Sequence, residues 1–591
     1  MSRCLRSRIV PLVILQFWIK LVSALFFSTL LSAIFGALLA RDGSPAIGNT
    51  ALLDFARTPW GILTLLILPV AYLSINYFEY SCVLRVFADP QGGVVDALFA
   101  SLIALPKLLW MAVIQTLVGL VLLAPFLLLA GLTYWILLTD ADINFYLANR
   151  PPKFILAIAI GVLLSAFSLA VLGLLLLRWF HALPRLVFES RGTIETLRLS
   201  WRETSNWPII LMAILVWFGI FFCAYLVVPV LLSWVTATLF NYVDHDSDGS
   251  IMAAMAILLL HTTILSIIGA ASQCWLAAAI WTTYDRPLPT DYGTTKRSAL
   301  TQKLWIRPLL LVSASTLVGL AIGLTAFQQV LNFTVRQQVQ IVAHRAGSKG
   351  FPENSLSALQ HAIGVKSDCA EIDVQLSKDG TVYVAHDRDL RRTAGLPMVL
   401  SESRDEELAK ADMGSQATPP FPTEPLATFD EFLQKSANQI RLSVELKYYG
   451  FQPKLAEKVL ELLKKHPSNP AHEIISLEYQ ALEQVAKLDP NIRRGFLVSA
   501  SVGDITKLNV NFLSVSKNAF SPELLERAQK RDMQVAVWTV NDREEMFRLM
   551  VRGADLIVTD DPALAVEVAR EYHELSKIEL LLVRLRESLS R

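Results

Sequence analysis

Cysteine and charge are both scarce in this sequence. The chain has five cysteines in 591 residues, no pair has the spacing of a structural metal site, and Cys369 alone lies beyond residue 330. Charged residues make up 18% of the chain, and 53 Lys and Arg nearly balance 52 Asp and Glu, without basic stripes. This composition argues against a disulfide framework in the second half and against nucleic acid as a partner.

Hydrophobic residues, in contrast, make up 53% of the chain, which is too many for a purely soluble protein. They gather before residue 330 in runs long enough to cross a bilayer, so we predict an all-α transmembrane helical domain at residues 1–335. The seven predicted spans are Leu21–Ala40, Gly61–Tyr80, Leu108–Leu138, Phe154–Leu177, Pro208–Trp234, Met252–Trp281 and Pro308–Phe327.

Lys and Arg are unevenly distributed among the segments that connect these spans. If the N-terminus is cytoplasmic, the inner segments hold 16 of these residues and the outer loops hold four. By the positive-inside rule, an odd number of spans then places the C-terminal half outside the cytoplasm. We therefore expect a multi-pass protein of the cell membrane, in contact with the lipid bilayer, with an extracytoplasmic C-terminal domain.

Two features of the first half have both a functional and a structural interpretation. Residues 244–249 read Asp-His-Asp-Ser-Asp-Gly, like the first half of a calcium-binding EF-hand loop, but Met255 stands where a bidentate Glu is expected. An acidic, solvated loop is the alternative. His261, inside the sixth predicted span, could mark a pathway or simply hydrogen-bond to a neighbouring helix.

From residue 341 onward, short β-branched runs alternate with amphipathic helical stretches. This order predicts an α/β TIM (β/α)8 barrel at residues 336–575, followed by an amphipathic C-terminal helix at residues 576–591. Nine strand candidates exceed the eight that a barrel needs. Because Asp379-Gly380 is typical of a hairpin turn, one run is expected to be an extra strand.

Acidic residues occur on two of the predicted strands. Glu371 and Asp373 are two residues apart and therefore leave the same face of a strand, and Glu445 and Lys447 repeat this spacing. Carboxylates that converge inside a barrel need a cation or a proton, and hard oxygen ligands suit Ca²⁺ or Mg²⁺. The sequence thus predicts a divalent cation site at the C-terminal strand ends.

Two histidines also lie at predicted strand ends. His344 precedes Arg345, and His386 follows the strand after the acidic pair. A single histidine is usually structural, but two that flank a carboxylate pair favour general acid–base chemistry. The guanidinium of Arg345 has the planar shape that binds phosphate oxygens. Asn354 is expected to cap the helix that follows it.

These residues fall in motifs that resemble the glycerophosphodiester phosphodiesterase family, which is related to the TIM-barrel phospholipases C. The motifs follow the order of the family through almost the whole second half, and the first half resembles in layout the membrane domain that some bacterial members carry. They are His344-Arg345, Pro352-Glu353-Asn354, Glu371-Ile-Asp373-Val, Lys378-Asp379-Gly380, His386-Asp387, Val444-Glu-Leu-Lys447, Val537-Trp-Thr-Val-Asn541 and Ile557-Val-Thr-Asp560.

The resemblance implies a role for each of eight residues. Glu371, Asp373 and Glu445 would ligate the metal, and His344 and His386 would act as acid and base. Arg345 and Lys447 would bind the phosphate, and Trp538 would pack against the glycerol. One departure is Ala346, where the family usually has Gly.

The activity that the resemblance implies is hydrolysis of glycerophosphodiesters to glycerol 3-phosphate and an alcohol. In the family, the neighbouring glycerol hydroxyl is thought to attack phosphorus first, and water then opens the cyclic phosphate. Two alternatives remain open. The substrate could be a lysophospholipid or a glycerolphosphate polymer, or the chain could be a sensor or transporter that binds diesters without cleaving them.

Overall fold

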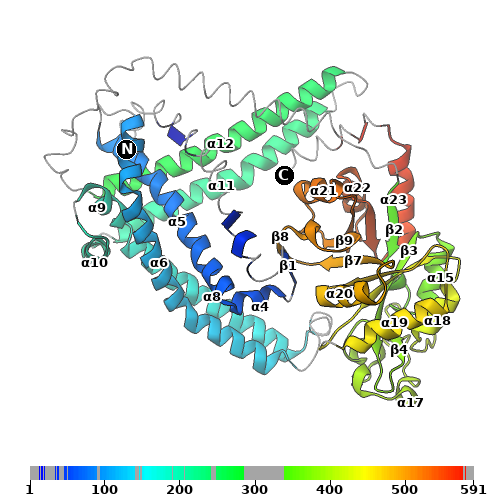
Figure 1. Cartoon of the computed structure of the whole chain (residues 1–591). Helices are drawn as coiled ribbons and strands as arrows, with labels where there is room; N and C mark the ends of the chain where they lie inside the picture. Colours follow the sequence, from blue (N-terminus) through cyan, green and yellow to red (C-terminus); the bar gives the residue numbers. More distant parts are fainter. Residues whose placement is uncertain are drawn as a thin grey trace.

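The structure, a computed structural model, describes most of the chain in nine continuous segments. These are residues 46–49, 51–89, 94–139, 150–189, 191–204, 207–240, 248–284, 338–450 and 452–576, with isolated positions elsewhere. Figure 1 shows long helices on one side of the molecule and a barrel on the other.

The first half is helical throughout its longer described segments. Helix α5 packs along α6, α6 packs along α8, and α11 pairs with α12. Two short helices, α9 and α10, connect α8 to α11 (Figure 1). The helices are α4 (Ala51–Arg57), α5 (Pro59–Ala88), α6 (Val94–Leu137), α8 (Pro152–Arg178), α9 (Ala182–Phe188), α10 (Thr193–Glu203), α11 (Trp207–Phe240) and α12 (Asp248–Tyr284).

Five of the seven predicted spans correspond to described helices that are long and apolar enough to cross a membrane: α5, α6, α8, α11 and α12. Most large apolar side chains on α6, α8 and α11 point outward, as expected where lipid is the solvent. The first and seventh predicted spans fall mostly or wholly outside the described residues, as do most of the 244–249 loop and the His261 side chain.

The second half forms a closed barrel of eight parallel strands, as predicted. The strand order is β2-β3-β5-β6-β7-β9-β10-β11, and pairing of β2 with both β3 and β11 closes the ring. The strands are β2 (Gln340–Ala343), β3 (Cys369–Leu376), β5 (Arg441–Leu446), β6 (Glu473–Ser476), β7 (Arg493–Val498), β9 (Phe512–Ser516), β10 (Gln534–Trp538) and β11 (Leu556–Thr559).

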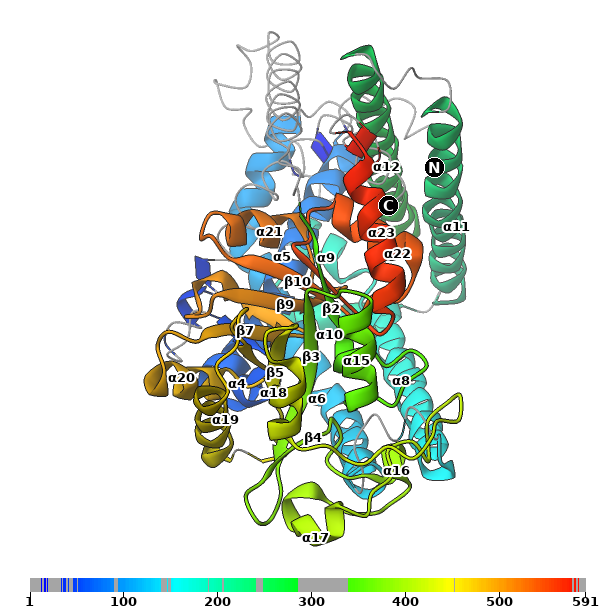
Figure 2. The same ribbon diagram turned by 90° about the vertical axis from the view of Figure 1, so that its right-hand side faces the viewer.

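The expected extra strand is β4 (Val382–Val384), which pairs antiparallel with β3 across the Asp379-Gly380 turn. Longer helices cover the outside of the barrel, and Figure 2 faces the side that carries α15, α22 and α23. The covering helices are α15 (Leu356–Gly364), α18 (Phe429–Ser436), α19 (Pro453–Lys465), α20 (Tyr479–Leu488), α21 (Pro522–Gln529), α22 (Arg543–Val551) and α23 (Pro562–Glu574).

The main core of the barrel lies between the strands and these helices. On β3, Ile372 and Val374 belong to this core, while Glu371 and Asp373 alternate with them and occupy the opposite face. Every residue of β3 is buried because both faces are covered. In the C-terminal tail, Leu580 is also buried in this core, so the tail packs on the barrel at that point.

One strand pair joins the two halves of the chain and was not predicted. Strand β1 (Ala46–Gly48), from the first half, pairs antiparallel with β8 (Ser501–Gly503), in the loop after β7. Ala46 is buried in the core of the barrel although it lies between the first and second predicted spans. Figure 1 shows β1 and β8 between the long helices and the barrel.

Candidate active site

Three acidic side chains meet inside the barrel at neighbouring strands. Asp373 on β3 and Glu445 on β5 are register partners, and Glu371 precedes Asp373 on the same face of β3. All three side chains are buried, and one carboxylate oxygen from each lies within 4.8 Å of the other two. The predicted convergence of these residues is therefore confirmed.

The charges of this cluster suit a divalent cation. Burial raises the pKa of Glu445 to about 8; the Lys447 ammonium, 2.9 Å away, opposes this rise, and the charges of Asp373 and Glu371 add to it. Burial also raises the pKa of Glu371. Asp373 Oδ1 accepts no hydrogen bond, although Lys447 Nζ lies 3.5 Å away. Lys447 and Arg345 lie within 4.0 Å of this group of three buried carboxylates, and Arg345 is shared with Glu353. A divalent cation with oxygen ligands would supply the remaining positive charge.

Each predicted histidine is held by a carboxylate through its Nδ1 atom. His344, directly after β2, lies 2.6 Å from Asp560 Oδ1, and Ser348 also donates a hydrogen bond to this oxygen. His386 Nδ1 lies 2.8 Å from Oδ1 of the adjacent Asp387. A carboxylate at Nδ1 fixes the ring orientation and leaves Nε2 for a substrate.

The surroundings shift the pKa values of the two rings in opposite directions. Burial would lower the pKa of His344, but the negative charges of Glu371 and Asp560 outweigh burial and raise it. Burial lowers the pKa of His386, and Asp373 only partly offsets this shift. His344 therefore keeps a proton more readily than His386 does.

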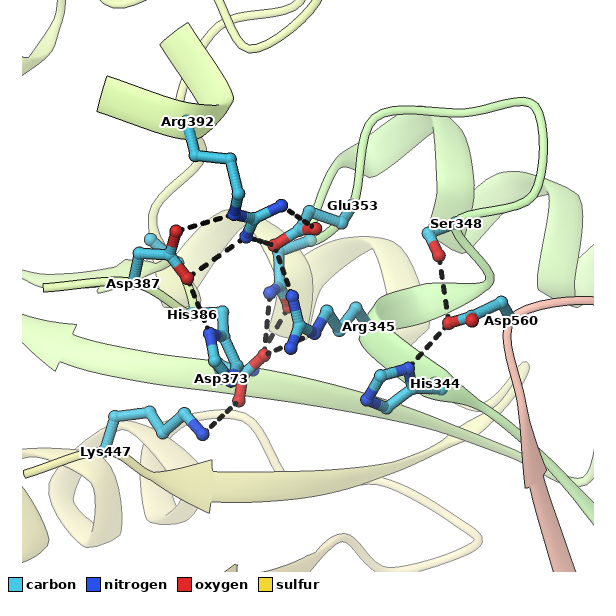
Figure 3. Close-up of polar contacts among 12 residues, drawn as sticks. His344, Arg345, Ser348, Glu353, Asp373, His386, Asp387, Arg392, Lys447 and Asp560 are labelled. Atoms are coloured by element: carbon cyan, nitrogen blue, oxygen red, sulfur yellow. Dashed lines mark hydrogen bonds and ion pairs between the residues drawn. The ribbon is translucent and has the colours of Figure 1, made fainter. Parts of the chain in front are cut away.

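A partly buried chain of ion pairs connects Arg345 to His386 (Figure 3). Arg345 Nη1 donates to Glu353 Oε1 at 2.9 Å, and Arg392 donates to both oxygens of Glu353 at 2.6 and 2.7 Å. Arg392 Nε also donates to Asp387 at 2.6 Å, and Asp387 holds the imidazole of His386. Arg345 Nε lies 4.0 Å from Asp373, which places this guanidinium beside the acidic cluster.

The expectation that Asn354 caps α15 is wrong. Ser355 is the N-cap, since its side chain accepts a hydrogen bond from the Ala358 N–H. Asn354 is buried and instead donates to Asp373 Oδ2 at 2.8 Å, while its Oδ1 accepts from the Asp373 backbone N–H at 3.1 Å. The amide therefore orients an acidic residue of the cluster rather than a helix end.

The turn after His344 has left-handed backbone geometry. Arg345 and Ala346 have φ values of 48° and 67°, and Gly347 follows at 92°. Glycine adopts this region without strain, which explains why the family usually has Gly where this chain has Ala346. The local conformation is nevertheless formed, and it places Arg345 beside Glu353.

Both halves of the chain match known families. Residues 344–564 match the glycerophosphoryl diester phosphodiesterase family, and residues 3–324 match the membrane domain of glycerophosphoryl diester phosphodiesterase. The chain belongs to the glycerophosphodiester phosphodiesterase family. It is accordingly a phosphodiesterase with a membrane domain, and its buried acidic cluster is consistent with a metal site.

Curated relatives of this phosphodiesterase match its barrel. A glycerophosphodiester phosphodiesterase of Caldanaerobacter subterraneus is 29% identical over 39% of this chain and 98% of its own length. The human protein named lysophospholipase D is 22% identical over 37% of this chain and 83% of its own length.

Solved structures also match this region. A phosphodiesterase of Oleispira antarctica, solved in complex with the product sn-glycerol-3-phosphate, is 28% identical over 39% of this chain and 96% of its own, with a TM-score of 0.37. A glycerophosphodiester phosphodiesterase of Thermotoga maritima is 27% identical over 39% of this chain and 98% of its own, with a TM-score of 0.33.

Of the eight predicted site residues of the phosphodiesterase, Trp538 lies apart from the acidic cluster. It is on β10, which stands opposite β5 in the ring of eight strands. Its indole N–H donates to the Ser514 carbonyl at 2.9 Å, and the ring packs in an apolar cluster. This cluster, which we call the apolar wall, consists of Ile475, Leu477, Leu497, Phe512 and Trp538.

Five residues with close contacts to the predicted site had received no such role from the sequence. They are Glu353, Asn354, Asp387, Arg392 and Asp560. Four of them lie in the quoted motifs, and Asp387 directly follows a predicted catalytic histidine. Arg392 lies in α16 (Arg391–Ala394), a short helix of the segment after His386, where no local pattern signals a contact with the site.

Proposed function

We propose that this phosphodiesterase hydrolyses glycerophosphodiesters to glycerol 3-phosphate and an alcohol. The observation that carries the proposal is the buried group of Glu371, Asp373 and Glu445 between two carboxylate-held histidines. A Ca²⁺ or Mg²⁺ ion held by the three acids would neutralise charge on the phosphate as phosphorus becomes five-coordinate. Arg345 and Lys447 would bind phosphate oxygens, and Trp538 would contact the glycerol.

The two histidines divide the proton transfers in this proposal. His386, whose pKa is lowered, accepts the proton of the attacking glycerol hydroxyl at Nε2. His344, whose pKa is raised, donates its Nε2 proton to the oxygen of the leaving alcohol. Water then opens the cyclic phosphate as the two rings exchange roles, so both recover their initial protonation states. Asp387 and Asp560 keep the rings oriented.

We also propose the domain division and the orientation. Residues 1–335 form the membrane domain, residues 336–575 the barrel and residues 576–591 a C-terminal amphipathic helix. The barrel lies outside the cytoplasm, because Lys and Arg concentrate in the segments that an N-terminus in the cytoplasm would place inside.

A second candidate substrate is a lysophospholipid. Two observations favour it: the apolar wall inside the barrel, and the membrane domain that anchors the barrel near lipid. The human relative named lysophospholipase D fits the same possibility.

The test is a substrate assay with the full-length protein in lipid nanodiscs. We expect glycerol 3-phosphate to be released from glycerophosphocholine with Ca²⁺ or Mg²⁺ and release to stop with EDTA. His344→Ala and His386→Ala should each lower kcat by at least about 100-fold. His466→Ala is the control, since this residue pairs with Asp430, at a distance from the barrel interior. Diester binding without turnover by the wild type would instead support a sensor or transporter.

A further inference from the structure

A strand of the membrane half completes the active-site end of the barrel. Ala46, Ile47 and Gly48 are register partners of Gly503, Val502 and Ser501, which follow β7. The approach is close, since a Cβ at Gly48 would lie 3.1 Å from the ring of Phe496. Because β7 is a parallel barrel strand, this contact is at the C-terminal end, where the catalytic residues lie.

Asn49 fastens this strand to two neighbouring barrel strands. Its Nδ2 donates to the carbonyls of Leu477 and Leu497 at 3.0 and 2.7 Å, and its Oδ1 accepts from both the N–H and the hydroxyl of Ser499 at 2.9 Å. Its backbone N–H donates to the Ala500 carbonyl at 2.9 Å. The two donors and two acceptor positions of the side-chain amide are therefore all used.

The residues that Asn49 holds are part of the substrate side of the barrel. Leu477 follows β6 and Leu497 lies near the end of β7, and both side chains belong to the apolar wall with Trp538. This wall runs from Ile475, the register partner of Glu445, to Trp538 on β10, which is opposite β5. Asn49 thus fixes the backbone of Leu477 and Leu497. These residues are part of the apolar wall, which lies beside the proposed glycerol position.

The same contact holds this end of the barrel near the bilayer. The spanning helix α5 begins at Pro59, ten residues after Asn49. Ten residues reach at most roughly 35 Å when fully extended, and less here because Ala51–Arg57 is helical, with a rise of about 1.5 Å per residue. A lipid that leaves the bilayer surface therefore has a short path to the apolar wall.

We propose that residues 46–49 are a docking strand through which the membrane half selects substrates that carry an apolar chain. Asn49 is a positioning residue for the apolar wall, and the preferred substrate is a lipid-borne glycerophosphodiester with an acyl chain on its glycerol. The bond cleaved is the same as in the proposed function, on which this inference rests. Over the two steps of the proposed function, water supplies in net terms a hydroxide to phosphorus and a proton to the departing alcohol.

The first test compares lysophosphatidylcholine with glycerophosphocholine, which share choline as the leaving alcohol. Asn49→Gly removes the amide yet tolerates the local φ of 54°. In nanodiscs, we expect this variant to lower the ratio of kcat/KM for the lipid to that for the soluble diester at least tenfold. Asp54→Ala, an exposed change on α4, should leave the ratio unchanged.

A cross-link provides the second test. Cys223 is the exposed one of the four described cysteines, so Cys223→Ser removes a competing thiol. On this background, cysteines at the register partners Ile47 and Val502 lie within disulfide range if β1 is docked. The disulfide should form, preserve turnover and restore the substrate ratio in the Asn49→Gly variant.

Three results are decisive against one or both proposals. The docking-strand proposal alone would be overturned if the wild type turned over both substrates and Asn49→Gly left the ratio of the two kcat/KM values unaltered. It would also be overturned if the disulfide formed but abolished turnover. Absence of turnover on both substrates by the wild type would overturn the proposed function and this inference together.

Discussion

The barrel and the membrane half place their apolar side chains on opposite sides. In the barrel, Phe429 and Phe432 are fully buried between helix and strand, and the acidic cluster shares the interior of the ring with the apolar wall. In the membrane half, Ile103 and Leu128 on α6 are 82% and 74% exposed. The difference shows that water is the solvent of the barrel and lipid is the solvent of the membrane half. The effect of a substitution on stability or activity should therefore depend on the half in which it lies.

The largest expected effect is the loss of one acid from the barrel interior. Glu371→Gln keeps the side-chain shape but removes a charge of the proposed metal site. We expect kcat to fall at least about 1,000-fold, because the cation contributes several kcal/mol of transition-state stabilisation. Steady-state kinetics and calorimetric titration with Ca²⁺ or Mg²⁺ measure the change.

Glu424→Gln is the matched control, since Glu424 is equally buried but bonds to Ser357 instead of the cluster. Undiminished activity and metal binding in Glu371→Gln would contradict the metal site.

The next largest effect should follow from removal of Arg392. Arg392→Ala removes the cation that the partly buried Glu353 and the buried Asp387 share. We expect the free energy of unfolding to fall by about 3 kcal/mol, because the two carboxylates lose this ion pair. We expect kcat to fall roughly tenfold or more, because Asp387 then holds the His386 ring less firmly. Chemical denaturation of the barrel and kinetics report the two effects.

The adjacent Arg391→Ala is the control for this variant, because Arg391 is more exposed and lies 3.8 Å from Asp389. Equal losses of unfolding free energy and of kcat in the two variants would show that the ion-pair chain supports neither stability nor catalysis.

A smaller effect should appear as a pH dependence of barrel stability. Burial lowers the pKa of His472 to about 4, and its Nδ1 accepts a hydrogen bond from the Leu442 N–H. The unfolded chain binds this proton more readily, so stability present above pH 6.5 is lost as pH falls toward 4. The loss from this residue is about 3 kcal/mol.

Thermal unfolding of the wild type and His472→Asn between pH 7 and 4 isolates this contribution. Asn can accept the same hydrogen bond without titrating, so its unfolding temperature should fall less steeply with acid. Identical pH profiles would show that His472 is not held neutral by burial.

The smallest effect is expected on the lipid-facing surface. Ile103→Ala on α6 should change the free energy of unfolding in lipid by less than about 0.5 kcal/mol, because lipid replaces the lost contacts. Leu108→Ala, five residues further along, should cost about 2 to 5 kcal/mol because Leu108 is fully buried. Unfolding in nanodiscs compares the two, and equal losses would contradict the lipid-facing assignment.

The sequence by itself determined the features that depend on local periodicity. The nine strand candidates, including the extra strand β4, correspond to observed strands, because alternation and turn residues act over a few neighbours. The length of apolar runs likewise located five described membrane helices. Glu371 and Asp373 could be placed on one face from their spacing, since the pleat of a strand has a period of two.

Only the tertiary structure decided the contacts between distant or irregular segments. Asp560 meets His344 across 216 residues, and Asn49 meets Ser499 across 450. Arg392 reaches the site from a short helix without a periodic signal, and Asn354 turns to Asp373 because Ser355 caps the helix. Such contacts depend on how the closed barrel and the membrane half bring chain ends and loops together, which no local pattern encodes.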